Sequence, residues 1–334
     1  MNGLKKLAVA TAVGAALGLA AGPAAADSVY GGAEILIQNL TIAFSPTTGA
    51  AVSTFNFGAS DNANLVGAAD SNTVNCGGTL ATNSCSTTSP VLDATAANAP
   101  GGTVTRNNLD FSFFGPGTDT YANSESAIIT AELVQGVPTN TGSVSEAELQ
   151  NGVNGIASAA TNVQSTTGLN LNFTTSAPGS VTITFQADPY LLSFIDSTGT
   201  SGATSLANIS AQIRLNGAGQ TAQWNPDGTI DAFAICSGGL TCTETADTQD
   251  LNRQTTVAAP PIPATDAYSV TPGFTNYSIT ISGLLAGAYS LALTADTSVI
   301  LNQTAAVPEP GTLVLLGLGL AGLGFAGRRI RNSR

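Results

Sequence analysis

The feature that most limits how this chain can fold is the alternation of apolar and polar residues in short segments. In the segment at 180–195, Val181, Ile183 and Phe185 alternate with Thr182 and Thr184. Successive side chains of a β-strand point to opposite sides, so this alternation predicts a strand with one buried face. The pattern recurs at 33–44, 207–219, 276–283 and 287–301, and turn-forming residues separate these segments.

These segments predict an all-β domain at 27–306, a β-sandwich of jelly-roll-like topology that is long enough to bury a sizeable core. Polar or proline-rich stretches at 45–78, 88–102 and 254–266 are expected to be long loops. The stretch at 143–165 is ambiguous, because a short helix there would have to contain Gly152 and Gly155.

The N-terminus differs from this domain in charge and hydropathy. Lys5 and Lys6 precede an apolar stretch, and the small residues Ala24 and Ala26 come just before Asp27. A basic start, an apolar stretch and an A-x-A site predict a secretory signal peptide at 1–26, cleaved before Asp27 by the export machinery. The alternative is an N-terminal membrane anchor, but the apolar stretch is too short to favour a full membrane span.

The C-terminus has a pattern of its own. An uncharged run at 311–327 has the length of a thin transmembrane helix. Two prolines in the preceding stretch, Val307, Pro308, Glu309 and Pro310, forbid regular helix there. The last seven residues hold four arginines, Arg328, Arg329, Arg331 and Arg334. Because basic residues stay on the cytoplasmic side, we expect the domain outside and this basic tail at 328–334 inside.

The whole of 307–334 resembles the PEP-CTERM sorting signal of Gram-negative bacteria, which combines a Pro-Glu-Pro motif, a Gly/Leu-rich span and an arginine cluster. The resemblance implies a transient anchor in the inner membrane, recognition by an exosortase, and release or transfer towards the cell surface and its exopolysaccharide. The alternative is a permanent single-pass anchor that tethers a periplasmic domain.

Segments 121–134 and 169–306 carry a second resemblance, to the EDSAVA-type subgroup of PEP-CTERM proteins. The segment that gives the subgroup its name here reads Glu125-Ser126-Ala127, with Ser124 in place of the first acid and Ile128 in place of valine. The subgroup implies no biochemical activity that could be carried over to this chain.

The four cysteines fit an exported protein. Cys76 and Cys85 enclose one short glycine-containing loop and Cys236 and Cys242 another, so two local disulfides are the simplest of three pairings. A metal site built from all four is the alternative, but the chain has neither CxxC spacing nor any histidine.

The lack of histidine excludes Ser-His-Asp, Cys-His and His-zinc catalysis. Residues 27–309 hold all 21 acidic residues and three arginines, a net charge of −18 that opposes nucleic acid and anionic lipid as partners.

The acidic residues nevertheless leave two kinds of site open. Two carboxylates could catalyse glycoside hydrolysis, and the candidates are Asp188, Asp196, Asp227 and Asp231. No cofactor is expected except Ca²⁺, for which Asp247 and Asp250 near Glu244 offer oxygen ligands without a known calcium-loop spacing.

Trp224, the sole tryptophan, lies beside a tight turn and is a candidate platform for stacking on sugars, but the favoured interpretation is that it caps the core next to the turn. Together these features predict a non-enzymatic, exosortase-processed protein of the cell surface or exopolysaccharide matrix. The alternative is a lectin-like module that binds the exopolysaccharide itself.

Overall fold

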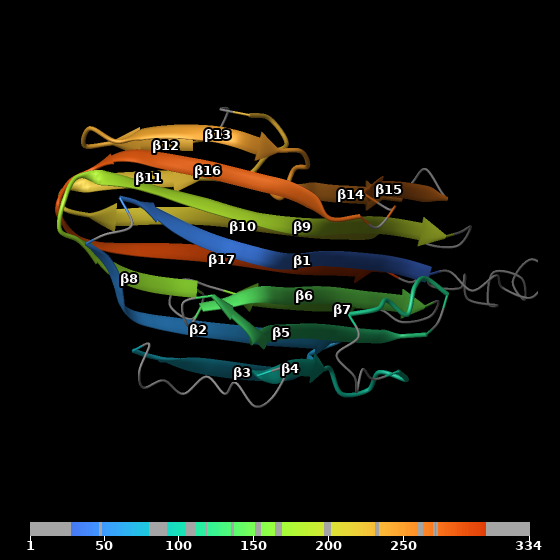
Figure 1. Cartoon of the computed structure of the whole chain (residues 1–334). Coiled ribbons are helices and arrows are strands. Elements are labelled where there is room, and N and C mark those ends of the chain that lie inside the picture. The colour runs from blue at the N-terminus through green and yellow to red at the C-terminus, as the bar shows by residue number, and fades with distance from the viewer. Residues whose placement is uncertain are drawn as a thin grey trace, which may run out of the picture.

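The fold consists of two antiparallel β-sheets, and the described residues contain no helix. The computed structural model describes residues 28–46, 49–79, 92–104, 111–117, 119–134, 137–150, 155–163, 169–196, 202–230, 234–259, 263–269, 271 and 273–304. The prediction of an all-β domain is therefore confirmed, and the sheets lie face to face along their length (Figure 1).

The first sheet has eight strands in the order β13-β16-β9-β1-β6-β5-β4, with β15 also paired to β9. They are β1 (Ser28–Ser45), β4 (Leu92–Asn98), β5 (Tyr121–Val134), β6 (Val137–Gln150), β9 (Gly179–Asp196), β13 (Thr241–Asp247), β15 (Ala264–Tyr268) and β16 (Thr275–Leu284).

The second sheet has nine strands in the order β12-β11-β10-β17-β7-β2-β3, with β14 paired to β10 and β8 paired to β17 and β2. They are β2 (Ala50–Leu65), β3 (Ala68–Gly78), β7 (Gly155–Val163), β8 (Leu169–Thr175), β10 (Ala203–Gly217), β11 (Gln220–Trp224), β12 (Ala234–Ser237), β14 (Gln254–Ala258) and β17 (Gly287–Gln303).

The core lies between the two sheets and is built from the apolar faces that alternation predicts. Val181, Ile183 and Phe185 of β9 are buried, and the ring of Phe185 stacks on that of Tyr277 with centroids 4.9 Å apart. The last two strands, β16 and β17, belong to different sheets and bury their tyrosines and aliphatic residues from opposite sides of the core.

Hydroxyl groups also cross the space between the sheets. Ser145 Oγ lies 2.8 Å from Thr297 Oγ1, and Ser193 Oγ lies 3.0 Å from Thr255 Oγ1. Ser205 Oγ donates to the carbonyl oxygen of Tyr30 at 2.6 Å. Direct hydrogen bonds of this length hold the sheets close where the inward side chains are small.

Several predicted loops are strands instead. The stretch at 45–78 contains all of β2 and β3, and 88–102 contains β4. The stretch at 254–266 contains β14 and the first three residues of β15, and the ambiguous stretch at 143–165 contains the end of β6 and all of β7. These loop predictions were wrong. Several inward residues there are small, such as Ala59 and Ala63 between the larger Phe57 and Leu65 of β2, so the apolar alternation that marks a strand is weak although these residues are buried against the opposite sheet. Pairing with neighbouring strands decides their conformation, and local propensity does not.

Both ends of the described chain lie at the same end of the sandwich. β1 begins at Ser28, opposite Gln150 and Asp196, while β17 ends at Gln303, opposite Ala203 and Gly155. Gln303 Nε2 donates to the carbonyl oxygen of Gln150 at 3.4 Å, so the two ends are neighbours. This end, on the right in Figure 1, is called the terminal pole below.

Candidate functional site

The outer face of the first sheet carries a regular array of uncharged polar side chains, which we call the hydroxyl grid. Antiparallel register places Thr184 between Thr41 and Ser278, and Thr182 beside Thr280. The members of the grid are Thr41, Ser45, Ser180, Thr182, Thr184, Thr241, Thr243, Ser278, Thr280 and Ser282, with Gln38, Gln186 and Asn276 as a row of amides at one end. All of them are exposed or half-buried.

Members of the grid bond to one another across the strands. Thr182 Oγ1 lies 2.9 Å from Thr280 Oγ1, and Thr41 Oγ1 is hydrogen-bonded to Thr184 Oγ1. Gln186 Nε2 donates to Asn276 Oδ1 at 3.0 Å, and Gln186 Oε1 accepts from Gln38 Nε2 at 3.1 Å. These bonds hold donors and acceptors in rows about 4.8 Å apart, the spacing of neighbouring strands.

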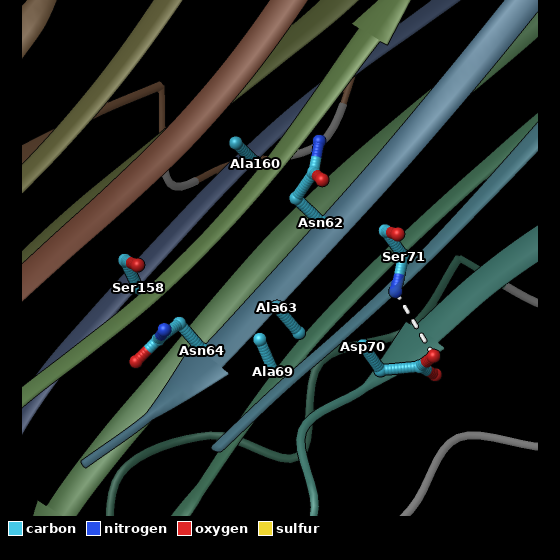
Figure 2. Close-up of a pocket in the computed structure, with 8 residues that line it drawn as sticks. All are labelled: Asn62, Ala63, Asn64, Ala69, Asp70, Ser71, Ser158 and Ala160. Atoms are coloured by element: carbon cyan, nitrogen blue, oxygen red, sulfur yellow. Dashed lines mark hydrogen bonds between the residues drawn. The ribbon is translucent and has the colours of Figure 1, made fainter. Parts of the chain in front are cut away.

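A shallow polar hollow lies on the outer face of the second sheet. Figure 2 shows Asn62 and Asn64 of β2 beside small side chains of β3 and β7, which leave a volume of about 410 Å³. The carboxylate of Asp70 at its rim accepts the N–H of Ser71 at 2.9 Å and that of Asn98 at 3.2 Å. The hollow therefore offers amides and hydroxyl groups to a ligand.

Trp224 is not an exposed platform for sugars. Its side chain is only 1% exposed, because it occupies an inward position on β11 opposite Ile213 and packs against Phe185 with ring centroids 5.9 Å apart. The favoured interpretation, that Trp224 belongs to the core, is confirmed.

Two of the carboxylates predicted as glycosidase candidates lie far apart. Asp188 and Asp196 lie eight residues apart on β9, a separation of about 26 Å along a strand and too long for a catalytic pair. Asp188 accepts the N–H of Gly273 at 2.9 Å and so ties β9 to the segment before β16. Asp227 accepts the N–H of Thr229 at 3.0 Å and orders its own turn. Asp231 lies outside the described residues.

Two of the three candidate calcium ligands lie close to Asp227. Asp250 pairs with Asp227 in an isolated bridge, and the Asp247 carboxylate accepts the N–H groups of Asp227 and Gly228 at 2.9 and 3.0 Å. Burial raises the pKa of Asp247, while these two N–H groups lower it. Glu244 is buried at an inward position opposite Ile279. Within the described ranges, no three His, Cys, Asp or Glu side chains are placed to hold a metal ion.

Sequence reasoning missed a set of buried acids. Glu146 and Glu148 are fully buried on the outer side of β6, under residues 111–117, which we call the strap. Glu146 accepts hydrogen bonds from the N–H groups of Phe114 and Gly115 and from the Tyr30 hydroxyl, at 2.8 to 3.1 Å. Glu148 accepts the N–H of Gly117 at 2.7 Å. Glu146 and Glu148 alternate with Ser145 and Ala147, as acidic residues do on the solvent-facing side of a strand. The sequence therefore did not indicate that these two acids are buried.

The disulfide between Cys236 and Cys242 is present, with Cα atoms 5.8 Å apart, and it joins β12 of the second sheet to β13 of the first. Cys76 in β3 is also disulfide-bonded. Its predicted partner, Cys85, lies outside the described residues, so that pairing stays a prediction.

The predicted targeting segments, 1–26 with Ala24, Ala26 and Asp27, and 307–334 with Arg328, Arg329, Arg331 and Arg334, lie outside the described residues. The described part of the chain contains no helix with the length and apolar character needed to cross a membrane.

Comparison with known families assigns one part of the chain. No curated protein and no solved structure matches it. Residues 306–330 match the family model of the PEP-CTERM protein-sorting motif, over the stretch where the sequence placed Val307 to Pro310 and the apolar run. This chain therefore carries a PEP-CTERM sorting signal, which directs export to the cell envelope and is recognised by exosortase.

Proposed function

We propose that residues 27–306 form a non-catalytic component of the cell surface or extracellular matrix that contacts exopolysaccharide through the hydroxyl grid. The observation that carries this proposal is the grid itself, a flat array of neutral hydrogen-bonding groups on four neighbouring strands. The matched sorting signal supports the route to the surface, through the secretory machinery and a transient anchor in the inner membrane.

A flat hydroxyl grid suits an extended polymer better than a small ligand. Each hydroxyl contributes a modest net hydrogen-bond energy, about 1 kcal/mol, so affinity depends on many simultaneous contacts. The grid contains no charged residue, although residues 27–309 carry a net charge of −18. An acidic polysaccharide therefore meets less repulsion there than at an acidic surface, and a neutral one meets none.

The lectin-like alternative now rests on the hollow in Figure 2, because the buried Trp224 cannot stack on a sugar. Asn62, Asn64 and Ser158 would supply hydrogen bonds to a short glycan at that position. A membrane-tethered periplasmic domain is the second alternative, and it differs from the main proposal only in the fate of residues 307–334.

Replacing Thr182, Thr184 and Thr280 by valine tests the grid, because valine keeps the shape and strand propensity of threonine and removes its hydroxyl. We expect roughly tenfold weaker co-sedimentation of the triple variant with exopolysaccharide from the host.

The matched control replaces Thr54, Thr204 and Thr294, which lie on the outer side of the second sheet, and should co-sediment like the unaltered protein. If both triple variants co-sediment with the exopolysaccharide as well as the unaltered protein does, the polymer does not bind the grid. Loss of retention only on Asn64→Ala would favour the lectin-like alternative.

A further inference from the structure

Exposed apolar side chains gather at the terminal pole, on the outer face of the second sheet. Ile156 and Ile300 are 53% and 50% exposed and lie on the neighbouring strands β7 and β17, where Ile300 is opposite Ser158. Val66, 52% exposed, donates its N–H to the carbonyl oxygen of Ile156 at 2.9 Å. The half-buried Leu206 of β10 lies directly opposite Ile300. These four residues are called the pole patch.

The turn at Val66 has a residue that folding alone would not favour. Val66 and Gly67 join β2 to β3 with φ angles of 52° and 88°, the left-handed conformation of a two-residue hairpin. Asn-Gly is the favoured pair for such a turn, whereas a β-branched residue is strained there. The chain thus keeps an exposed apolar residue at a position where asparagine would stabilise the turn, as is seen where strain serves function.

The position of the pole patch relative to the sorting signal limits what can cover it. Val307 follows Ile300 by seven residues, which span at most about 25 Å of extended chain. The matched motif begins at residue 306, two residues after Thr304, the last described residue. An enzyme that holds residues 307–310 in its active site must therefore present its own surface within reach of this pole.

We infer that the pole patch is a docking surface for the exosortase that processes this chain, a contact with the folded domain in addition to the sorting motif. The inference rests on the proposed function, because it requires exosortase processing. A protein surface fits the pole patch better than the membrane does, because residues 27–309 carry a net charge of −18, which anionic lipid headgroups repel. Exposed apolar patches at such a place mark protein contacts.

The decisive experiment measures conversion of the full-length precursor in its host, by pulse-labelling and mass analysis, with exosortase limiting. The patch variant is Ile156→Thr with Ile300→Thr, and the matched control is Ile235→Thr with Leu285→Thr, two residues of similar exposure (64% and 49%) on β12 and in the β16–β17 turn. We expect the patch variant to be processed about fivefold more slowly than the unaltered chain and the control at the unaltered rate.

Val66→Asn separates docking from folding, because it should leave the melting temperature unchanged or higher and still slow processing. If the unaltered chain is processed and the patch variant, Val66→Asn and the control all match it, the docking inference is wrong and the sorting function stands. If the unaltered chain is not processed at all, the proposed sorting function itself fails. Unchanged processing with loss of dimers, or with loss of vesicle binding, would reassign the pole patch to self-association or to lipid.

Discussion

Replacing Asp61 by asparagine is expected to remove most of the pH dependence of stability between pH 4 and pH 8. Asp61 lies on β2 between the two sheets with none of its side chain exposed. Burial raises the pKa of Asp61 to about 8, the negative charge of Glu125 adds to the rise, and contacts with Ser126 oppose it only in part. Neither carboxyl oxygen forms a well-aligned hydrogen bond.

The direction of the effect follows from proton binding. Above about pH 4 the unfolded chain releases this proton, while the folded protein keeps it until about pH 8. The free energy of unfolding should therefore fall as the pH rises from 4 to 8, by up to about 5 kcal/mol, and then level off. Asparagine resembles the protonated acid in shape and does not titrate, so Asp61→Asn should lose this contribution and keep only the smaller decrease that comes from other acids with a raised pKa, such as Asp296.

Denaturant unfolding at several pH values measures this difference. Asp296→Asn is the matched control, because burial raises the pKa of Asp296 only to about 6 and its effect should end near that pH. Identical pH profiles for Asp61→Asn and the unaltered protein would contradict the buried position of Asp61.

Replacing Glu146 by glutamine should destabilise the protein by about 2 to 4 kcal/mol and release the strap. The carboxylate accepts three hydrogen bonds, two from strap N–H groups and one from Tyr30. Glutamine offers one acceptor oxygen and places an amide N–H₂ against donors, so buried N–H groups lose their partner.

Thermal unfolding measures the loss of stability, and limited proteolysis followed by mass analysis detects cleavage within the strap. Tyr30→Phe is the control, since it removes one donor and leaves both strap N–H contacts in place. Equal protease resistance in Glu146→Gln and the unaltered protein would mean that Glu146 does not hold the strap.

The sequence predicted those strands whose inward residues are large along the whole strand. Ile183, Phe185, Ile279 and Leu291 alternate with polar neighbours, and the contrast in hydropathy marks each buried face. In β2 and β7 the inward residues include Ala59, Asp61 and Ala159, whose contrast with their neighbours is small or reversed. Those strands depend on pairing with distant segments, which a local pattern does not contain. The jelly-roll-like connectivity stays a prediction.

The functional residues also divide into those that a local sequence pattern contains and those that only the fold brings together. The sorting signal is a contiguous motif, so it could be read directly and was matched at 306–330. The hydroxyl grid and the pole patch combine residues from distant strands, for example Thr41 with Thr184, and only strand register brings them together. The sequence left the platform open as an alternative for Trp224, because the inward position of this residue depends on the pairing of β11 with β10.

The most direct test of export and sorting is mass spectrometry of both ends of the mature protein from its host, with and without the exosortase. We expect the mature chain to begin at Asp27 and to end between Pro308 and Gly311, and we expect Arg334 to be retained when the exosortase is missing. A protein that keeps Arg334 in both strains would contradict processing, and the chain would then be a membrane-tethered periplasmic domain.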